Sequence, residues 1–172
     1  MVRPEDIEKT PWPEHDFLER AAHYWQAYKA QKRIGVFDWP RYLLAGHAVE
    51  VALKALLWSR GYPNYPLRRL RSKEFGHDLE KLMQEAHKYG LKPSAKVKND
   101  IADLGHVHGN YLARYPEYEG KTTHGRLNNP GCGIRAVKGL EPSIKWVLTE
   151  VSKLFRPKLI KRPPISKSRS AK

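Results

Sequence analysis

The chain has 172 residues, of which 40% are hydrophobic, and this length fits one domain with flanking tails. Its 32 lysines and arginines exceed its 18 acidic residues, so the net charge is +14 and polyanions such as nucleic acids are the natural partners. The single cysteine, Cys132, excludes an internal disulfide and a multi-cysteine zinc site, which fits a reducing cytoplasm. No apolar run is long enough to cross a membrane, and the polar N-terminus is unlike a signal peptide.

The N-terminal half is expected to hold a polar arm and two helices. Residues 1–15 form the arm, and a helix is predicted from about Asp16 to Gln31. A longer helix is predicted from Arg41 to Gly61, RYLLAGHAVEVALKALLWSRG, with Asp38 placed to cap its free amides and Pro40 suited to its first turn. Apolar residues cover most of its circumference, so we expect this helix to be buried.

Three polar residues, His47, Glu50 and Lys54, interrupt the apolar surface of the long helix. Their spacing of three and then four places them on one stripe, and Glu50 precedes Lys54 in the better orientation for an ion pair. The stripe is either the solvated side of the helix or a contact at which each charge has a partner, because an unpaired buried charge is costly.

A basic loop and two further helices are predicted next. The loop, GYPNYPLRRLRSKEFG, carries Arg68, Arg69 and Arg71 among aromatic residues, and these arginines are candidates for binding RNA or a nucleotide. A third helix is expected to open at His77 and Asp78, with Asp78 as its cap, and to stop at Gly90. A fourth should run from about Ser94 to Tyr115, because Pro116 breaks it.

The C-terminal part is predicted to contain a loop, a last helix and a tail. Glycine, asparagine and threonine dominate residues 117–139, which favours a long exposed loop. The last helix should start near Pro142. Residues 156–172 contain seven basic residues and no acid, so we expect a disordered tail that either adds salt-sensitive affinity for nucleic acid or only keeps the chain soluble.

Polar residues that suit RNA chemistry gather near the end of the fourth predicted helix. An arginine can clamp a phosphate, a histidine can exchange a proton with a ribose hydroxyl, and an amide or a phenol can orient a base. The alternative is an ordinary polar helix end in which the arginine counters the helix dipole. The residues are His106, His108, Asn110, Tyr111, Arg114 and Tyr115.

The histidines do not predict a metal site. His106 and His108 are two residues apart, hence on different faces of a helix, and no HExxH pair or nearby acidic cluster accompanies them. Neither a metal nor another cofactor is therefore expected.

Three phrases, LAGHAVEVALKALL, GHDLEKLMQEA and YLARYPEY, together resemble the HEPN domains, over about residues 16–155. The resemblance implies an all-α, four- to five-helix up-and-down bundle, usually a homodimer, with a cleft that faces RNA or a nucleotide. Many members are metal-independent ribonucleases of toxin–antitoxin or phage-defence systems, and others are non-catalytic partners of nucleotidyltransferases. The resemblance also favours a structural or cleft-lining ion pair between Glu50 and Lys54 over a solvated pair.

The catalytic motif of the family does not transfer directly. Its nuclease members have an arginine and a later histidine with roughly four to six residues between them, which places both near one helix face. Here nine residues separate Arg114 from His124, whereas Arg41 and His47 have a suitable separation but lie on a different helix. Three hypotheses follow. The first is a composite ribonuclease site in which Arg114 acts with His106, His108 or His124. The second is a non-catalytic bundle that binds RNA, a nucleotide or a partner protein such as an antitoxin or a nucleotidyltransferase, and the third is a bundle with no nucleic-acid role.

Overall fold

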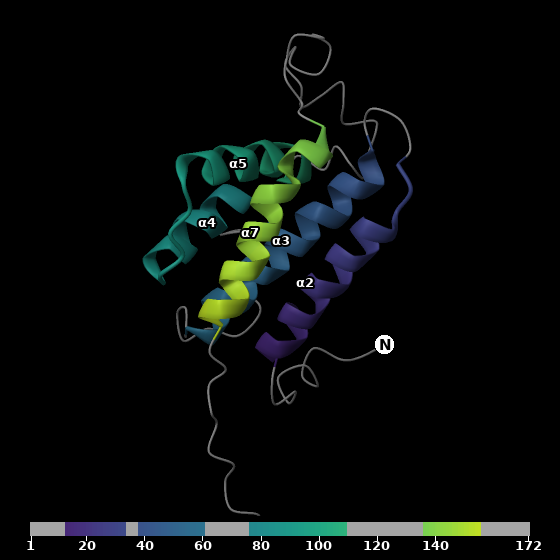
Figure 1. Cartoon of the computed structure of the whole chain (residues 1–172). Coiled ribbons are helices and arrows are strands. Elements are labelled where there is room, and N and C mark those ends of the chain that lie inside the picture. Colours follow the sequence, from purple (N-terminus) through teal and green to yellow (C-terminus); the bar gives the residue numbers. More distant parts are fainter. Residues whose placement is uncertain (1–12, 34–37, 61–75, 110–135, 156–172) are drawn as a thin grey trace, which may run out of the picture.

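The computed structural model describes residues 13–33, 38–60, 76–109 and 136–155, and this part of the chain is built from helices without a strand (Figure 1). Helices α2 and α3 are antiparallel neighbours, and α7 lies along α3 and also touches α2. Helices α4 and α5 cover another side of α3. The predicted all-α bundle is confirmed. The helix bounds are Pro13–Ala30 (α2), Trp39–Ser59 (α3), Leu79–Lys88 (α4), Ala95–Gly109 (α5) and Val137–Leu154 (α7).

Helix α3 is the centre of the bundle, since it contacts each of the other four described helices. Its start follows the sequence signals, because Asp38 Oδ1 accepts a hydrogen bond from the Arg41 amide at 3.4 Å and Pro40 lies in the first turn. Small residues such as Ala45, Ala48 and Ala52 are fully buried along it, so neighbouring helices can approach closely. Because other helices pack on several sides of α3, some of its polar side chains must be buried.

Helices α4 and α5 form a compact pair joined by a short turn. Asp78 caps α4 as predicted, since its Oδ1 accepts from the Lys81 amide at 3.0 Å. Gly90, in the turn, has a φ of 102°, which a residue with a side chain rarely adopts. Both helices bury apolar faces, and α5 packs against α3 and α7 as well as α4. This packing brings the C-terminal half of α5 against the middle of α3.

Two helix starts differ by three or more residues from those predicted. Helix α2 begins at Pro13, ahead of the predicted Asp16, and α7 begins at Val137, ahead of Pro142. Residues 137–139, predicted as the end of a loop, are therefore helical, and Pro142 lies inside the helix. Val137 and Leu140 are buried in the core, and this burial offsets the unfavourable glycine and proline in the first turns of α7.

Among the described residues, no helix is both long enough and apolar enough to span a membrane.

Candidate functional site

A buried ion pair lies in the middle of α3. Lys54 Nζ is 2.6 Å from Glu50 Oε1, each side chain is 6% exposed, and Lys54 also donates to the carbonyl oxygen of Gly76 at 2.9 Å. The ion pair expected from the sequence is therefore present. The alternative interpretation, a solvated stripe, is wrong for these two residues.

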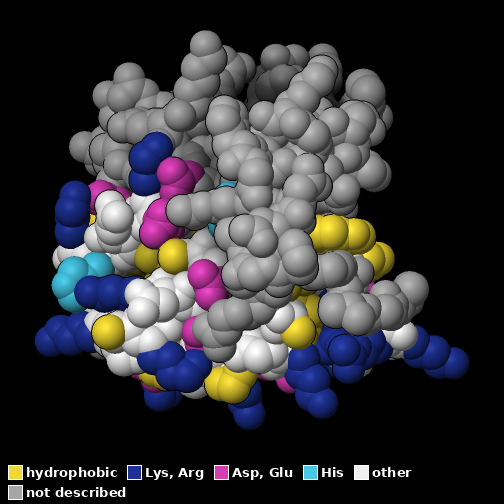
Figure 2. Space-filling view, turned by 90° about the horizontal axis from the view of Figure 1, so that it is seen from above, with side chains coloured by type: hydrophobic (Ala, Val, Ile, Leu, Met, Phe, Trp, Pro, Cys, Tyr) yellow, Lys and Arg dark blue, Asp and Glu magenta, His cyan; other side chains and the backbone are white. Residues whose placement is uncertain are grey.

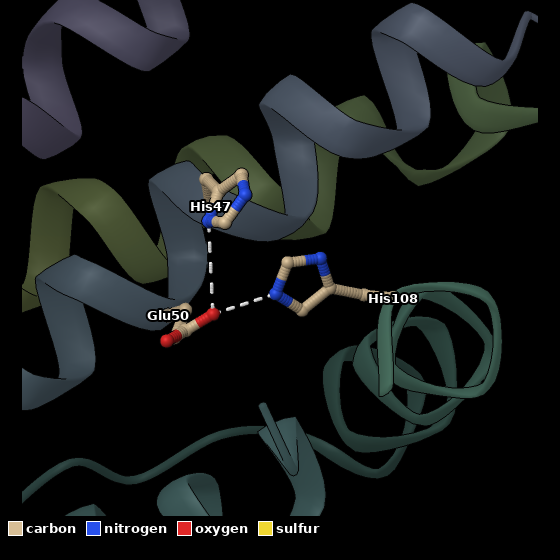
Figure 3. Close-up of side chains that lie close together, drawn as sticks. All are labelled: His47, Glu50 and His108. Atoms are coloured by element: carbon tan, nitrogen blue, oxygen red, sulfur yellow. Dashed lines mark hydrogen bonds and ion pairs between the residues drawn. The ribbon is translucent and has the colours of Figure 1, made fainter. Parts of the chain in front are cut away.

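Three histidines surround the other oxygen of the same carboxylate. Glu50 Oε2 lies 2.6 Å from His108 Nε2, 2.8 Å from His77 Nδ1 and 3.7 Å from His47 Nδ1. His47 and Glu50 belong to α3 and His108 to α5, and Figure 3 shows both imidazoles directed at the same oxygen of the carboxylate. His77 lies in the turn before α4. We refer to His47, Glu50, Lys54, His77 and His108 as the Glu50 cluster.

The carboxylate of Glu50 is ionised in the cluster. Burial by itself would raise the pKa of Glu50, but the hydrogen bond from His108 and the positive charge of Lys54 outweigh it and hold this pKa well below its usual range. An ionised carboxylate only accepts hydrogen bonds, so the facing nitrogens, Nε2 of His108 and Nδ1 of His77, must carry the protons. Glu50 thereby fixes the orientation and the tautomer of two imidazoles.

The cluster has an inner part and an outer part. The side chain of His108 is 0% exposed, whereas His47 and His77 are 22% and 27% exposed. The ring of Tyr24, on α2, stacks on His47 with 5.2 Å between centroids. His47 and His77 therefore form the partly exposed side of the cluster, and Glu50 and His108 form its buried side.

Gly46 makes room for the inner histidine. A Cβ atom at this position would lie 2.3 Å from His108 Nδ1 and 2.5 Å from His108 Cγ, which is closer than atoms can approach. Glycine at this point of α3 therefore lets the imidazole of α5 reach Glu50, which is the next acidic residue along the same helix.

Among the RNA-site residues predicted near the end of the fourth helix, the structure describes His106 and His108. His106 is exposed on α5 and His108 is buried, which confirms that the two lie on different faces. His108 contacts Glu50 in the interior of the bundle. The remaining candidates lie outside the described residues: Arg68, Arg69, Arg71, Asn110, Tyr111, Arg114, Tyr115 and His124.

Arg41, which has a suitable sequence separation from His47, is engaged elsewhere. Its Nη2 atom lies 3.1 Å from Glu141 Oε1, and its guanidinium lies 4.2 Å from the centroid of the Tyr28 ring. Tyr28 donates a hydrogen bond of 2.7 Å to the same Glu141 oxygen. Arg41 therefore links α2, α3 and α7.

The prediction that the histidines form no metal site overlooked one group of possible ligands. One nitrogen from each of His47 and His108 and one oxygen from Glu50 lie within 4.8 Å of one another. The sequence search considered short spacings, whereas His108 is 58 residues beyond Glu50. Two signals were available: the spacing of three between His47 and Glu50, and the position of His77 directly before a helix cap.

Comparisons with protein-family models, with curated proteins and with solved structures gave no match to this chain.

Proposed function

We propose that this protein binds RNA and cleaves it without a metal ion, with His47 and His77 of the Glu50 cluster as its acid and base. The observation that carries the proposal is the convergence of three imidazoles, from three segments of the chain, on one buried carboxylate. A buried anion that orients an imidazole is a recurrent arrangement in general acid–base catalysis.

The chemistry follows from the positions of the protons. Since His77 donates through Nδ1, its Nε2 is the nitrogen that takes the proton of a ribose 2′-hydroxyl, whose oxygen then attacks the adjacent phosphorus. A protonated His47, with its ring centroid 6.2 Å from that of His77, gives a proton to the departing 5′-oxygen. The products are a 2′,3′-cyclic phosphate end and a 5′-hydroxyl end. Arg114 remains the predicted stabiliser of the charge that develops on the phosphate.

The charge of the chain supports RNA as the substrate. The net charge is +14, and Figure 2 shows Lys and Arg side chains along the left and lower edges of the described part of this face. Such a charge attracts a polyanion and makes its binding sensitive to salt. The resemblance to the HEPN domains, with their toxin–antitoxin or phage-defence ribonucleases, points in the same direction, and a homodimer is part of this proposal.

The test is cleavage of a labelled single-stranded RNA in the presence of EDTA. We expect a cyclic phosphate product from the natural chain, and loss of cleavage in His47→Asn and His77→Asn, whereas His23→Asn should retain activity. His23 is a matched control because it is 64% exposed on α2 and lies outside the cluster. An RNA with 2′-O-methyl groups should resist cleavage. Intact RNA after incubation with the natural chain would exclude the catalytic proposal.

A second candidate function is a non-catalytic bundle that binds a nucleotide or RNA, or that partners a nucleotidyltransferase. The burial of Glu50 and His108 favours it, because both residues then tie α3 to α5 without contacting a ligand. In that case the natural chain would bind RNA with an affinity that falls as salt is added, and leave it uncut.

A further inference from the structure

We propose that His47, Glu50 and His108 form a binding site for Zn²⁺. Their ligand atoms lie within 4.8 Å of one another, and His77 Nδ1 is 2.8 Å from the same Glu50 oxygen. The site concerns metal binding alone and holds whether or not the protein cleaves RNA.

The ligand atoms lie close to the arrangement that a zinc ion requires. Bonds of about 2.0–2.2 Å in a tetrahedron place neighbouring ligand atoms about 3.4 Å apart. Glu50 Oε2 is 3.7 Å from His47 Nδ1 and 2.6 Å from His108 Nε2, so the second separation must widen by roughly 1 Å for the metal to enter. Figure 3 shows that both nitrogens face the carboxylate, so this change is a small shift of side chains already directed to one point.

The three ligand residues are held in place by packed helices and by neighbouring side chains. His47 and Glu50 are one turn apart on the buried helix α3, and His108 is held against Gly46 by the packing of α5. Lys54 holds Oε1 of Glu50, so the carboxylate presents a single oxygen, Oε2, to the metal. Contacts of this kind behind a ligand set its orientation and raise metal affinity.

The donor set suits zinc among the common metal ions. Two imidazoles and a carboxylate are borderline donors that Zn²⁺ binds well, whereas Mg²⁺ and Ca²⁺ prefer sites made of oxygen atoms. For zinc to bind, the Nε2 proton that His108 donates to Glu50 must leave this nitrogen. A cationic imidazole releases the proton to solvent, and a neutral one transfers it to Nδ1, so the bound ring is neutral in both cases. His77 or a water molecule completes the tetrahedron.

Zinc at this position would act on the proposed cleavage as an inhibitor. The ion would bind the nitrogen of His47, the proposed acid. It would also bind the Glu50 oxygen that accepts the hydrogen bond from His77, the proposed base, and so would remove the contact that orients this base. This consequence depends on the proposed function, whereas binding itself does not.

The experiment is isothermal titration calorimetry of the untagged, metal-free chain with ZnCl₂, with absorption spectroscopy of Co²⁺ as a second probe. We expect one ion per chain and tetrahedral Co²⁺ bands without a thiolate band. His47→Asn should weaken binding at least tenfold, and because His47 is partly exposed this variant should fold. Glu50→Gln should abolish binding.

Controls separate this site from the other metal-binding groups of the chain. His23→Asn and His87→Asn, on α2 and α4, should bind zinc with the affinity of the natural chain. Three results would overturn the proposal: no heat of binding, unchanged affinity in His47→Asn, or a Co²⁺ thiolate band, which would place the ion on Cys132. Failure of the cleavage assay would leave these results unaffected.

Discussion

His108 Nε2 on α5 lies 2.6 Å from Glu50 Oε2 on α3, and this contact joins two helices across 58 residues of sequence. Both side chains are buried, so the hydrogen bond forms in a medium where an unpaired charge is costly. Lys54 balances the charge of Glu50 from the same helix, and His77 adds a donor from the turn before α4. One carboxylate thus connects three segments of the chain.

We predict that Glu50→Gln lowers the free energy of unfolding by about 3–5 kcal/mol, since it leaves Lys54 buried without its counter-charge. Urea denaturation followed by circular dichroism measures the change. The matched control is Glu150→Gln, which breaks a pair of the same 2.6 Å length to Lys153, a side chain that is 64% exposed. That variant should lose less than about 1 kcal/mol. Equal losses in the two variants would show that burial of the Glu50–Lys54 pair does not increase the cost of breaking it.

The double variant Glu50→Gln with Lys54→Met should be more stable than Glu50→Gln alone. Removing the lysine charge removes the cause of the destabilisation, while the methionine fills a similar volume. The same urea titration measures the recovery. If the second substitution lowers stability further, the loss in Glu50→Gln does not come from the unpaired lysine.

The pH dependence of stability should also depend on Glu50. Its pKa in the folded chain is below the ordinary value of 4.5, so the unfolded chain takes up this proton first as the pH falls. The stability contributed by Glu50 is complete above the ordinary pKa and is lost progressively below it. The free energy of unfolding, measured from pH 6 down to about pH 3, should therefore fall more steeply in the natural chain than in Glu50→Gln. Parallel curves would rule out this assignment.

The sequence was sufficient to predict the helices whose signals are local. Asp38, Asp78 and Pro40 act within one turn of their own positions, so the starts of α3 and α4 were predicted to within two residues. The start of α7 was not, because Val137 and Leu140 gain their stability from distant core residues. The Glu50–Lys54 pair was predicted from a spacing of four. The contacts of His77 and His108 were not, because they depend on how α4 and α5 pack on α3.

We predict that Gly46→Ala displaces His108 from Glu50 and lowers the free energy of unfolding by about 1–3 kcal/mol, the usual range for an overfilled core. The imidazole resonances of His108, observed by nuclear magnetic resonance, should shift together with this loss. Gly109→Ala is the control, because its added methyl group would lie 3.5 Å from the carbonyl oxygen of His77, an ordinary contact distance. A stable Gly46→Ala variant with unchanged His108 resonances would contradict the packing described for this position.

The last prediction concerns Tyr28 and alkaline pH. Burial and the hydrogen bond to Glu141 raise the pKa of Tyr28 above its ordinary value of 10.0. Below pH 10 its contribution to stability is complete, and above it the unfolded chain loses the phenol proton first, so stability falls as the pH rises. Tyr28→Phe should lower stability by about 1 kcal/mol at pH 8 and reduce the fall between pH 9 and about pH 11. Trp25→Phe, which alters the ring stacked 4.7 Å from Tyr28 but keeps the hydroxyl, should preserve the steeper fall. If Tyr28→Phe and the natural chain lose stability equally with rising pH, the hydroxyl of Tyr28 is not the group that resists ionisation.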